Sequence, residues 1–127
     1  MTITKILTYG IKEDATDVRG KFLQLRFAGH EYLLFAPKEL HGFHNHILAH
    51  FLEDRELAHY WEDEHTLKVD AHGIEIVGGG KFVLDTAARK LDLFDNSQAY
   101  GRFDERGLGE RLAAAGHPWS EFKIGIS

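Results

Sequence analysis

The 127-residue chain contains no cysteine. This absence excludes disulfide bonds, thiolate metal sites and a cysteine nucleophile, although it does not fix the cellular compartment. No window of the sequence is apolar for long enough to cross a membrane, and residues 1–9 lack the basic and apolar regions of a signal peptide. We therefore expect a soluble, cytoplasmic protein that neither spans nor binds a membrane.

The sequence also lacks an excess of basic residues. Fifteen Lys and Arg stand against 20 Asp and Glu, which gives a formal net charge of −5 at pH 7. Surfaces that bind nucleic acid are basic, so general nucleic-acid binding is not expected. The negative net charge does not exclude a local basic pocket.

No internal repeat, low-complexity segment or linker divides the chain. A hydrophobic content of 43% with nine phenylalanines is typical of a folded protein. The length suits one domain with a substantial core. We therefore expect a single domain over residues 1–127, and a monomer is the simplest oligomeric state.

Apolar residues that alternate with polar ones predict most of the strands. Leu23, Leu25 and Phe27 alternate in this way after a polar loop over residues 12–20. The continuous apolar run 32–35 predicts a strand covered on both faces, which Pro37 ends. Further strands are expected at residues 3–7 (an edge strand), 67–69 and 74–76 (a hairpin across 70–73), 82–84, 91–94 and 122–126.

Two helical regions are expected. Asn45 is a plausible N-cap for a helix whose apolar face comprises Ile47, Leu48, Phe51 and Leu52. The next apolar residues, Leu57, Tyr60 and Trp61, fall on nearly the opposite face. We therefore predict a break between residues 53 and 56, with Asp54 as a possible cap of a second helical piece.

The second helical region is predicted over residues 104–115. Leu108 and Leu112 form its apolar side, and Gly116 and Pro118 end it. Together these patterns predict an α+β domain with a mixed β-sheet of six to seven strands, flanked by the two helical regions.

The segment from His41 to His50 holds four of the nine histidines and precedes a predicted helix. Free amides at a helix start favour phosphate, and an imidazole beside them would titrate near physiological pH. Alternatively, His46 and His50 lie four residues apart and could bind a metal with a third ligand from His41, His44 or a carboxylate, although no familiar spacing is matched. The segment could also be a helix entrance without a role.

Two glycine-containing segments could also approach an anion. Three glycines at 78–80 are poor strand formers, so they indicate either a tight reversal or a close backbone approach, with Lys81 supplying positive charge. The spacing is not that of a Walker loop. Residues 97–101 form a loop of small residues around the Ser97 hydroxyl, which is either an anion nest or a polar turn. Asp104 and Glu105 are interpreted as first-turn residues of a helix rather than a catalytic pair.

Four short motifs, taken in order, resemble those of the Janus/Ocnus family, whose best-known members are the eukaryotic protein histidine phosphatases. They are VRGKFLQL at 18–25, Phe43-His44, GGGK at 78–81 and SQAYG at 97–101. The resemblance extends from about Lys5 to Ile124. It implies a mixed sheet flanked by two helices, in agreement with the pattern of apolar residues.

The resemblance also implies roles for individual residues. His44 corresponds to the catalytic histidine, and Lys21 to a lysine that supports it. Ser97 and Ala99 match a loop that holds the phosphate. Lys81 stands where the family commonly has arginine, which keeps the charge but loses the bidentate geometry.

Other positions depart from the family. Phe43 replaces a tyrosine, and Asn45 and His46 replace other residues. The segment between His44 and the glycine triplet is longer than in the eukaryotic members.

The function expected from this comparison is a metal-independent phosphohistidine phosphatase that needs no cofactor. His44 and Lys21 would be catalytic, and Asn45, His46, Lys81, Ser97 and Ala99 would bind the phosphoryl group, largely through amides at 44–46 and 97–99. Neutral His44 would activate a water or attack phosphorus itself. The expected partners are phosphate and a protein that carries phosphohistidine. The alternatives are a non-catalytic phosphate-recognition or scaffold domain, and a metal-binding protein that uses the histidine cluster.

Overall fold

The computed structural model describes residues 2–127, which form a single α+β domain with two α-helices and a mixed sheet. This confirms the predicted fold class. The helices are α1 (His44–Asp54), α2 (Leu108–Ala113) and the 3-10 helix η1 (Pro118–Glu121). The strands are β1 (Thr4–Thr8), β2 (Asp17–Phe27), β3 (His30–Pro37), β4 (His59–Trp61), β5 (Leu67–Val69), β6 (Ile74–Asp85), β7 (Lys90–Phe94) and β8 (Lys123–Ile126).

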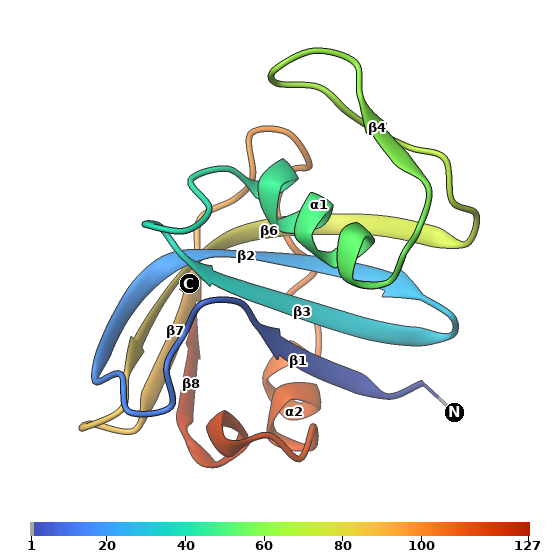
Figure 1. Cartoon of the computed structure of the whole chain (residues 1–127). Coiled ribbons are helices and arrows are strands. Elements are labelled where there is room, and N and C mark those ends of the chain that lie inside the picture. The colour runs from blue at the N-terminus through green and yellow to red at the C-terminus, as the bar shows by residue number, and fades with distance from the viewer. Residues whose placement is uncertain (1) are drawn as a thin grey trace.

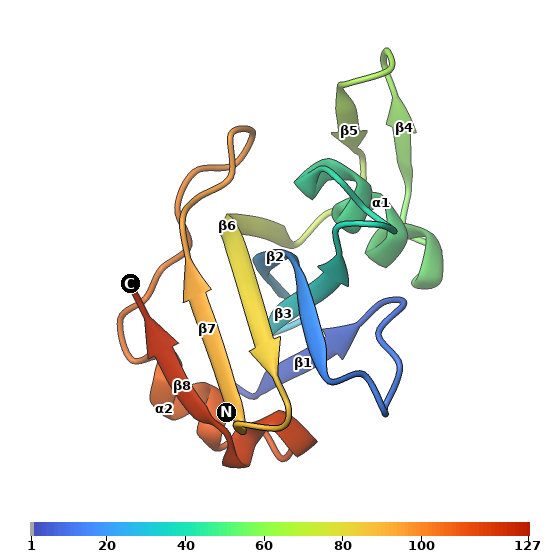
Figure 2. The ribbon, with the colours of Figure 1, turned by 90° about the vertical axis from the view of Figure 1, so that its left-hand side faces the viewer.

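Six strands form one curled sheet in the order β1-β3-β2-β6-β7-β8. The outermost strands, β1 and β8, run parallel to their neighbours, whereas the inner pairs are antiparallel. In Figure 1, α1 and α2 lie on opposite sides of this sheet. The separate hairpin of β4 and β5 stands beyond α1, away from the main sheet (Figure 2).

The curled sheet carries a hydrophobic cluster on each face. Residues 31–36 of β3 are all buried, as expected for a strand covered on both faces. Leu33 and Phe35 belong to the cluster under α2 and η1, and Leu34 and Ala36 to the cluster under α1. No helix formed by residues 2–127 is long and apolar enough to cross a membrane.

The break predicted after α1 is confirmed, but the second helical piece is wrong. Helix α1 ends at Asp54, and Glu56 then adopts a left-handed conformation with φ of 54°. Residues 59–61 form β4, which pairs with β5, so Asp54 caps no second helix. The hairpin predicted across 70–73, between strands 67–69 and 74–76, is also wrong. Strand β5 pairs with β4, and β6 pairs with β2.

The glycine triplet lies inside β6 and is not a tight reversal. The other interpretation, a close backbone approach, is correct. A Cβ on Gly79 would lie 2.6 Å from His44 Cδ2, and one on Gly80 would lie 2.5 Å from the Phe94 carbonyl oxygen. A Cβ on Gly78 would collide with the Arg102 carbonyl. The absence of side chains therefore lets three other segments press against the strand.

Two further boundaries differ from the sequence prediction. Strand β2 begins at Asp17, inside the predicted loop 12–20. Helix α2 begins only at Leu108, after Gly107 with φ of 67°, so Asp104 and Glu105 are not in its first turn. Asp104 instead accepts hydrogen bonds from the backbone and side chain of Arg106, which satisfies the carboxylate locally.

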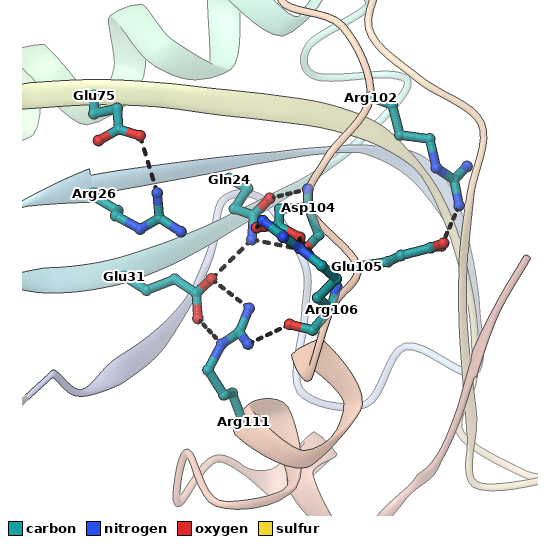
Figure 3. A network of polar contacts seen from close by, with 9 residues as sticks. All are labelled: Gln24, Arg26, Glu31, Glu75, Arg102, Asp104, Glu105, Arg106 and Arg111. Atoms are coloured by element: carbon teal, nitrogen blue, oxygen red, sulfur yellow. Dashed lines mark hydrogen bonds and ion pairs between the residues drawn. The ribbon is translucent and has the colours of Figure 1, made fainter.

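A buried polar network ties α2 to the sheet (Figure 3). Glu31 on β3 is only 3% exposed, and it accepts hydrogen bonds from Arg111 on α2 at 2.8 and 3.1 Å. Thr4 and Gln24 donate to the same carboxylate at 2.6 and 2.8 Å. Burial by itself would raise the pKa of Glu31, but these hydrogen bonds, led by that of Arg111, outweigh it and lower the pKa.

We predict that Arg111→Met destabilises the protein by about 3 kcal/mol, because it leaves a buried carboxylate without its cation. The stabilisation from a carboxylate with a lowered pKa is present above the pKa of the unfolded chain and is lost as pH falls through the folded value. The difference between wild type and variant should therefore shrink in acid. Urea unfolding at pH 7 and pH 3.5 measures both quantities.

Arg106→Met is the matched control for this prediction, because its side chain is 88% exposed and pairs with Asp104 at the surface. A surface ion pair contributes little. Equal losses in the two variants would contradict a structural role for the Glu31 network.

Candidate functional site

A cavity of about 480 Å³ lies where the start of α1 meets β2, β6 and the loop after β7. It brings together all seven residues expected from the sequence. Its lining comprises Lys21, Phe43, His44, Asn45, His46, Glu64, His65, Lys81, Asp95, Asn96, Ser97, Gln98 and Ala99.

His44 is the first residue of α1, and its ring lies against β6 at Gly79. Its Nε2 is 2.9 Å from the Gly80 carbonyl oxygen, and the residue is only 5% exposed. Although nearly buried, it lines the cavity rather than the apolar core. Strand β6 therefore holds the His44 ring in place through these two contacts.

This hydrogen bond determines which tautomer of neutral His44 is present. A carbonyl can only accept, so Nε2 carries the proton and Nδ1 is left with its lone pair. Nδ1 has no hydrogen bond to any residue from 2 to 127. Burial, assisted by the positive charge of Lys21, lowers the pKa of His44 despite the opposing effect of the Gly80 hydrogen bond. His44 is thus a neutral base at physiological pH.

Lys21 and Lys81 are directly opposite each other on the antiparallel strands β2 and β6. Lys81 Nζ lies 3.1 Å from Asp95 Oδ2, and this contact lowers the pKa of Asp95. Lys21 makes no ion pair within residues 2–127, and its Nζ lies 5.4 Å from the centre of the Phe43 ring. Like charges opposite each other in a sheet are destabilising unless something negative compensates them. The cavity therefore favours an anion next to Lys21.

Several backbone amides at the cavity are without partners among the described residues. At the start of α1 these are the amides of His44 and Asn45, and in the loop they are those of Gln98 and Ala99. Unpaired donors of this kind form anion sites.

Two of the amides expected to bind phosphate are engaged elsewhere. The amide of His46 donates to Phe43, and that of Ser97 donates to Gly101. Ser97 Oγ accepts from the Tyr100 amide at 3.1 Å. Ser97 therefore shapes the loop, and of the amides expected at 97–99 those of Gln98 and Ala99 are without partners among the described residues.

The sequence predicted Asn45 as the N-cap of α1, and this prediction is wrong. The N-cap is Phe43, in an extended conformation, and Asn45 lies within the first turn. Its Nδ2 donates to the His65 carbonyl at 2.9 Å and so holds the tip of the β4–β5 hairpin at the cavity. Within residues 2–127, its Oδ1 is the buried side-chain atom without a partner. A buried polar atom without a partner lowers the free energy of unfolding by about 1–3 kcal/mol. Proteins tolerate such losses of stability at functional sites.

Residues beyond the sequence-derived set come from two loops. The β4–β5 hairpin contributes Glu64 and His65, and the loop after β7 contributes Asp95, Asn96 and Gln98. The sequence predicted a second helical piece in the segment after His44, so it gave no signal that this hairpin would line the cavity.

The remaining histidines of the 41–50 segment bind one another and nearby rings. His41 Nε2 lies 2.8 Å from His50 Nδ1, and the His50 ring stacks on Tyr9 at 4.0 Å. His46 packs edge-on between Phe43 and Trp61. Among the residues that the structure describes, no three His, Asp or Glu side chains are arranged to hold a metal ion.

Comparison with known proteins did not identify a relative of this chain. No model of a known protein family matches the chain, and no curated protein is similar to it. The likeness to the Janus/Ocnus family therefore rests on the four short motifs alone.

We predict that Gly79→Ala displaces His44, because the added Cβ would lie 2.6 Å from His44 Cδ2 and 2.8 Å from the Phe22 carbonyl oxygen. Such overpacking typically costs about 1–3 kcal/mol. Chemical denaturation measures the loss, and NMR of the His44 imidazole reports the displaced ring.

Gly109→Ala in α2 provides the comparison, since nothing lies within 4 Å of its added Cβ. It should leave stability unchanged or raise it by up to about 1 kcal/mol. An unaltered His44 signal in Gly79→Ala would refute the packing argument.

Proposed function

We propose that the protein is a metal-independent phosphohistidine phosphatase of the Janus/Ocnus type, with His44 as general base or nucleophile. The observation that carries this proposal is the convergence of its motifs. Lys21, His44, Lys81 and the loop 97–99 come from four distant parts of the sequence and line one cavity. There, a neutral imidazole faces an uncompensated lysine and free amides, which is the set of groups that a phosphoryl transfer requires.

Lys21 and the free amides would bind the phosphoryl oxygens. Lys21 supplies the charge, and the amides of Gln98 and Ala99 supply fixed donors. Lys81 is held by Asp95, so it contributes orientation and a weaker field. Because a P–N bond is labile, positioning and charge neutralisation supply most of what the reaction needs.

His44 supports two routes. In the first, Nδ1 takes a proton from a water whose oxygen bonds to phosphorus as the P–N bond breaks, and the departing imidazole nitrogen is protonated from solvent. In the second, Nδ1 itself bonds to phosphorus as the P–N bond of the substrate breaks and the departing imidazole nitrogen is protonated from solvent. Water then breaks the new N–P bond, which releases phosphate and restores His44. In both, the Gly80 carbonyl accepts a hydrogen bond from Nε2–H and stabilises the positive charge that develops on the ring.

Replacing His44 with alanine should lower phosphate release from a phosphohistidine peptide by at least 100-fold, the usual contribution of a general base. Phosphoserine and phosphotyrosine peptides should be poor substrates of the wild type. Binding of inorganic phosphate, followed by NMR, should persist in the variant because the amides and Lys21 remain.

The alternatives make different predictions in the same assay. A phosphate-recognition module would bind phosphate without turnover in the wild type, and a metal-dependent protein would lose activity in chelator. Full activity of His44→Ala would remove His44 from the mechanism.

The pH dependence provides an independent measurement. The lowered pKa of His44 means that the base form prevails at lower pH than for an ordinary histidine, whose value is 6.5. The kcat/KM should therefore rise with pH to a plateau, with a midpoint below 6.5, and should stay level through neutral pH. A midpoint above 6.5 would show that the buried ring is not the titrating group.

A further inference from the structure

A second cavity of about 300 Å³ lies beside the first. His46 lines both, so the two cavities adjoin at that residue. The walls of the second cavity differ in charge, because Glu53 and Asp54 at the end of α1 line it together with Trp61 of β4.

The two carboxylates have no permanent cation as partner within residues 2–127. Glu53 Oε1 is 3.8 Å from His59 Nε2, and Asp54 Oδ2 is 3.7 Å from His50 Nε2. These histidines carry a charge only when protonated. The guanidinium of the adjacent Arg55 packs on the rings of Tyr32 and Phe51 and forms no ion pair with either acid. The cavity therefore holds two carboxylates that no lysine or arginine among the described residues neutralises.

Trp61 adds an aromatic surface to the second cavity. It is 37% exposed, and its contact is an edge with the His46 ring at 5.5 Å. No Lys or Arg within residues 2–127 lies over its indole. Tryptophan is the strongest aromatic partner for a cation, and carboxylates beside it add a charge-assisted hydrogen bond.

We propose that this second cavity binds the side chain of a lysine or arginine close in sequence to the phosphorylated histidine of the substrate. The inference rests on the proposed function, because it places the phosphoryl group in the first cavity. Because the two cavities adjoin at His46, an extended peptide with a long basic side chain reaches both. The enzyme would then prefer phosphohistidine in a basic sequence.

The test uses two phosphohistidine peptides of equal length, one with lysines and one with glutamines on both sides of the histidine. The small substrate phosphoramidate, which has no flanking residues, is measured in parallel. Wild type should hydrolyse the lysine peptide with about tenfold higher kcat/KM, as expected from two exposed ion pairs and one cation–π contact. The ratio should fall as salt is added.

The variant Glu53→Gln/Asp54→Asn should reduce that ratio to about one while leaving phosphoramidate hydrolysis unchanged. The matched control is Glu13→Gln/Asp14→Asn, which removes the same charge from an exposed loop that lines neither cavity. Its ratio should stay at the wild-type value. Trp61→Ala should give an intermediate ratio, and circular dichroism confirms that each variant is folded.

The outcomes separate the two proposals. If wild type hydrolyses phosphoramidate but treats both peptides alike, the second cavity is not a subsite, and the proposed function stands. A preference that is equally reduced in the control variant reflects overall charge and also overturns the inference. If wild type hydrolyses none of the three substrates, the proposed function fails, and the subsite fails with it.

Discussion

The contact between His44 and β6 determines the arrangement of the site. An imidazole can lie flat against a strand only where the strand has no side chain, and Gly79 provides that position. The Gly80 carbonyl then fixes the tautomer and leaves Nδ1 with its lone pair on a residue that lines the cavity. Three glycines weaken a strand. The segments at Arg102 and Phe94 pack closely on this one and stabilise it.

Positive charge gathers at the candidate site although the net charge of the chain is negative. The chain is acidic overall, yet Lys21 and Lys81 are neighbours across two strands. Only Lys81 has a carboxylate partner among the described residues. Sheet register therefore concentrates positive charge at one point, which a count of charged residues cannot reveal.

Local patterns predicted the strands and helices that are governed by burial, and they failed where distant segments decide. The all-apolar run at 32–35 was predicted because both faces of a central strand need apolar residues. Trp61 was assigned to a helix because its β-pairing with Leu67 has no local signature. The glycine triplet was ambiguous because its close neighbours, such as His44, lie far away in sequence. Seven residues of the cavity were anticipated through motif order, whereas Glu64 and His65 come from the β4–β5 hairpin, which was not predicted.

The β4–β5 hairpin has its own two-stranded ladder and shares no ladder with the six-stranded sheet. Loops of this kind tolerate changes of length and sequence far better than the elements they join. The hairpin can therefore change in length or sequence while the segments that hold His44 keep their arrangement. Exchanging residues 57–73 for another sequence is consequently expected to reshape one wall of the cavity while the contact between His44 and β6 stays in place.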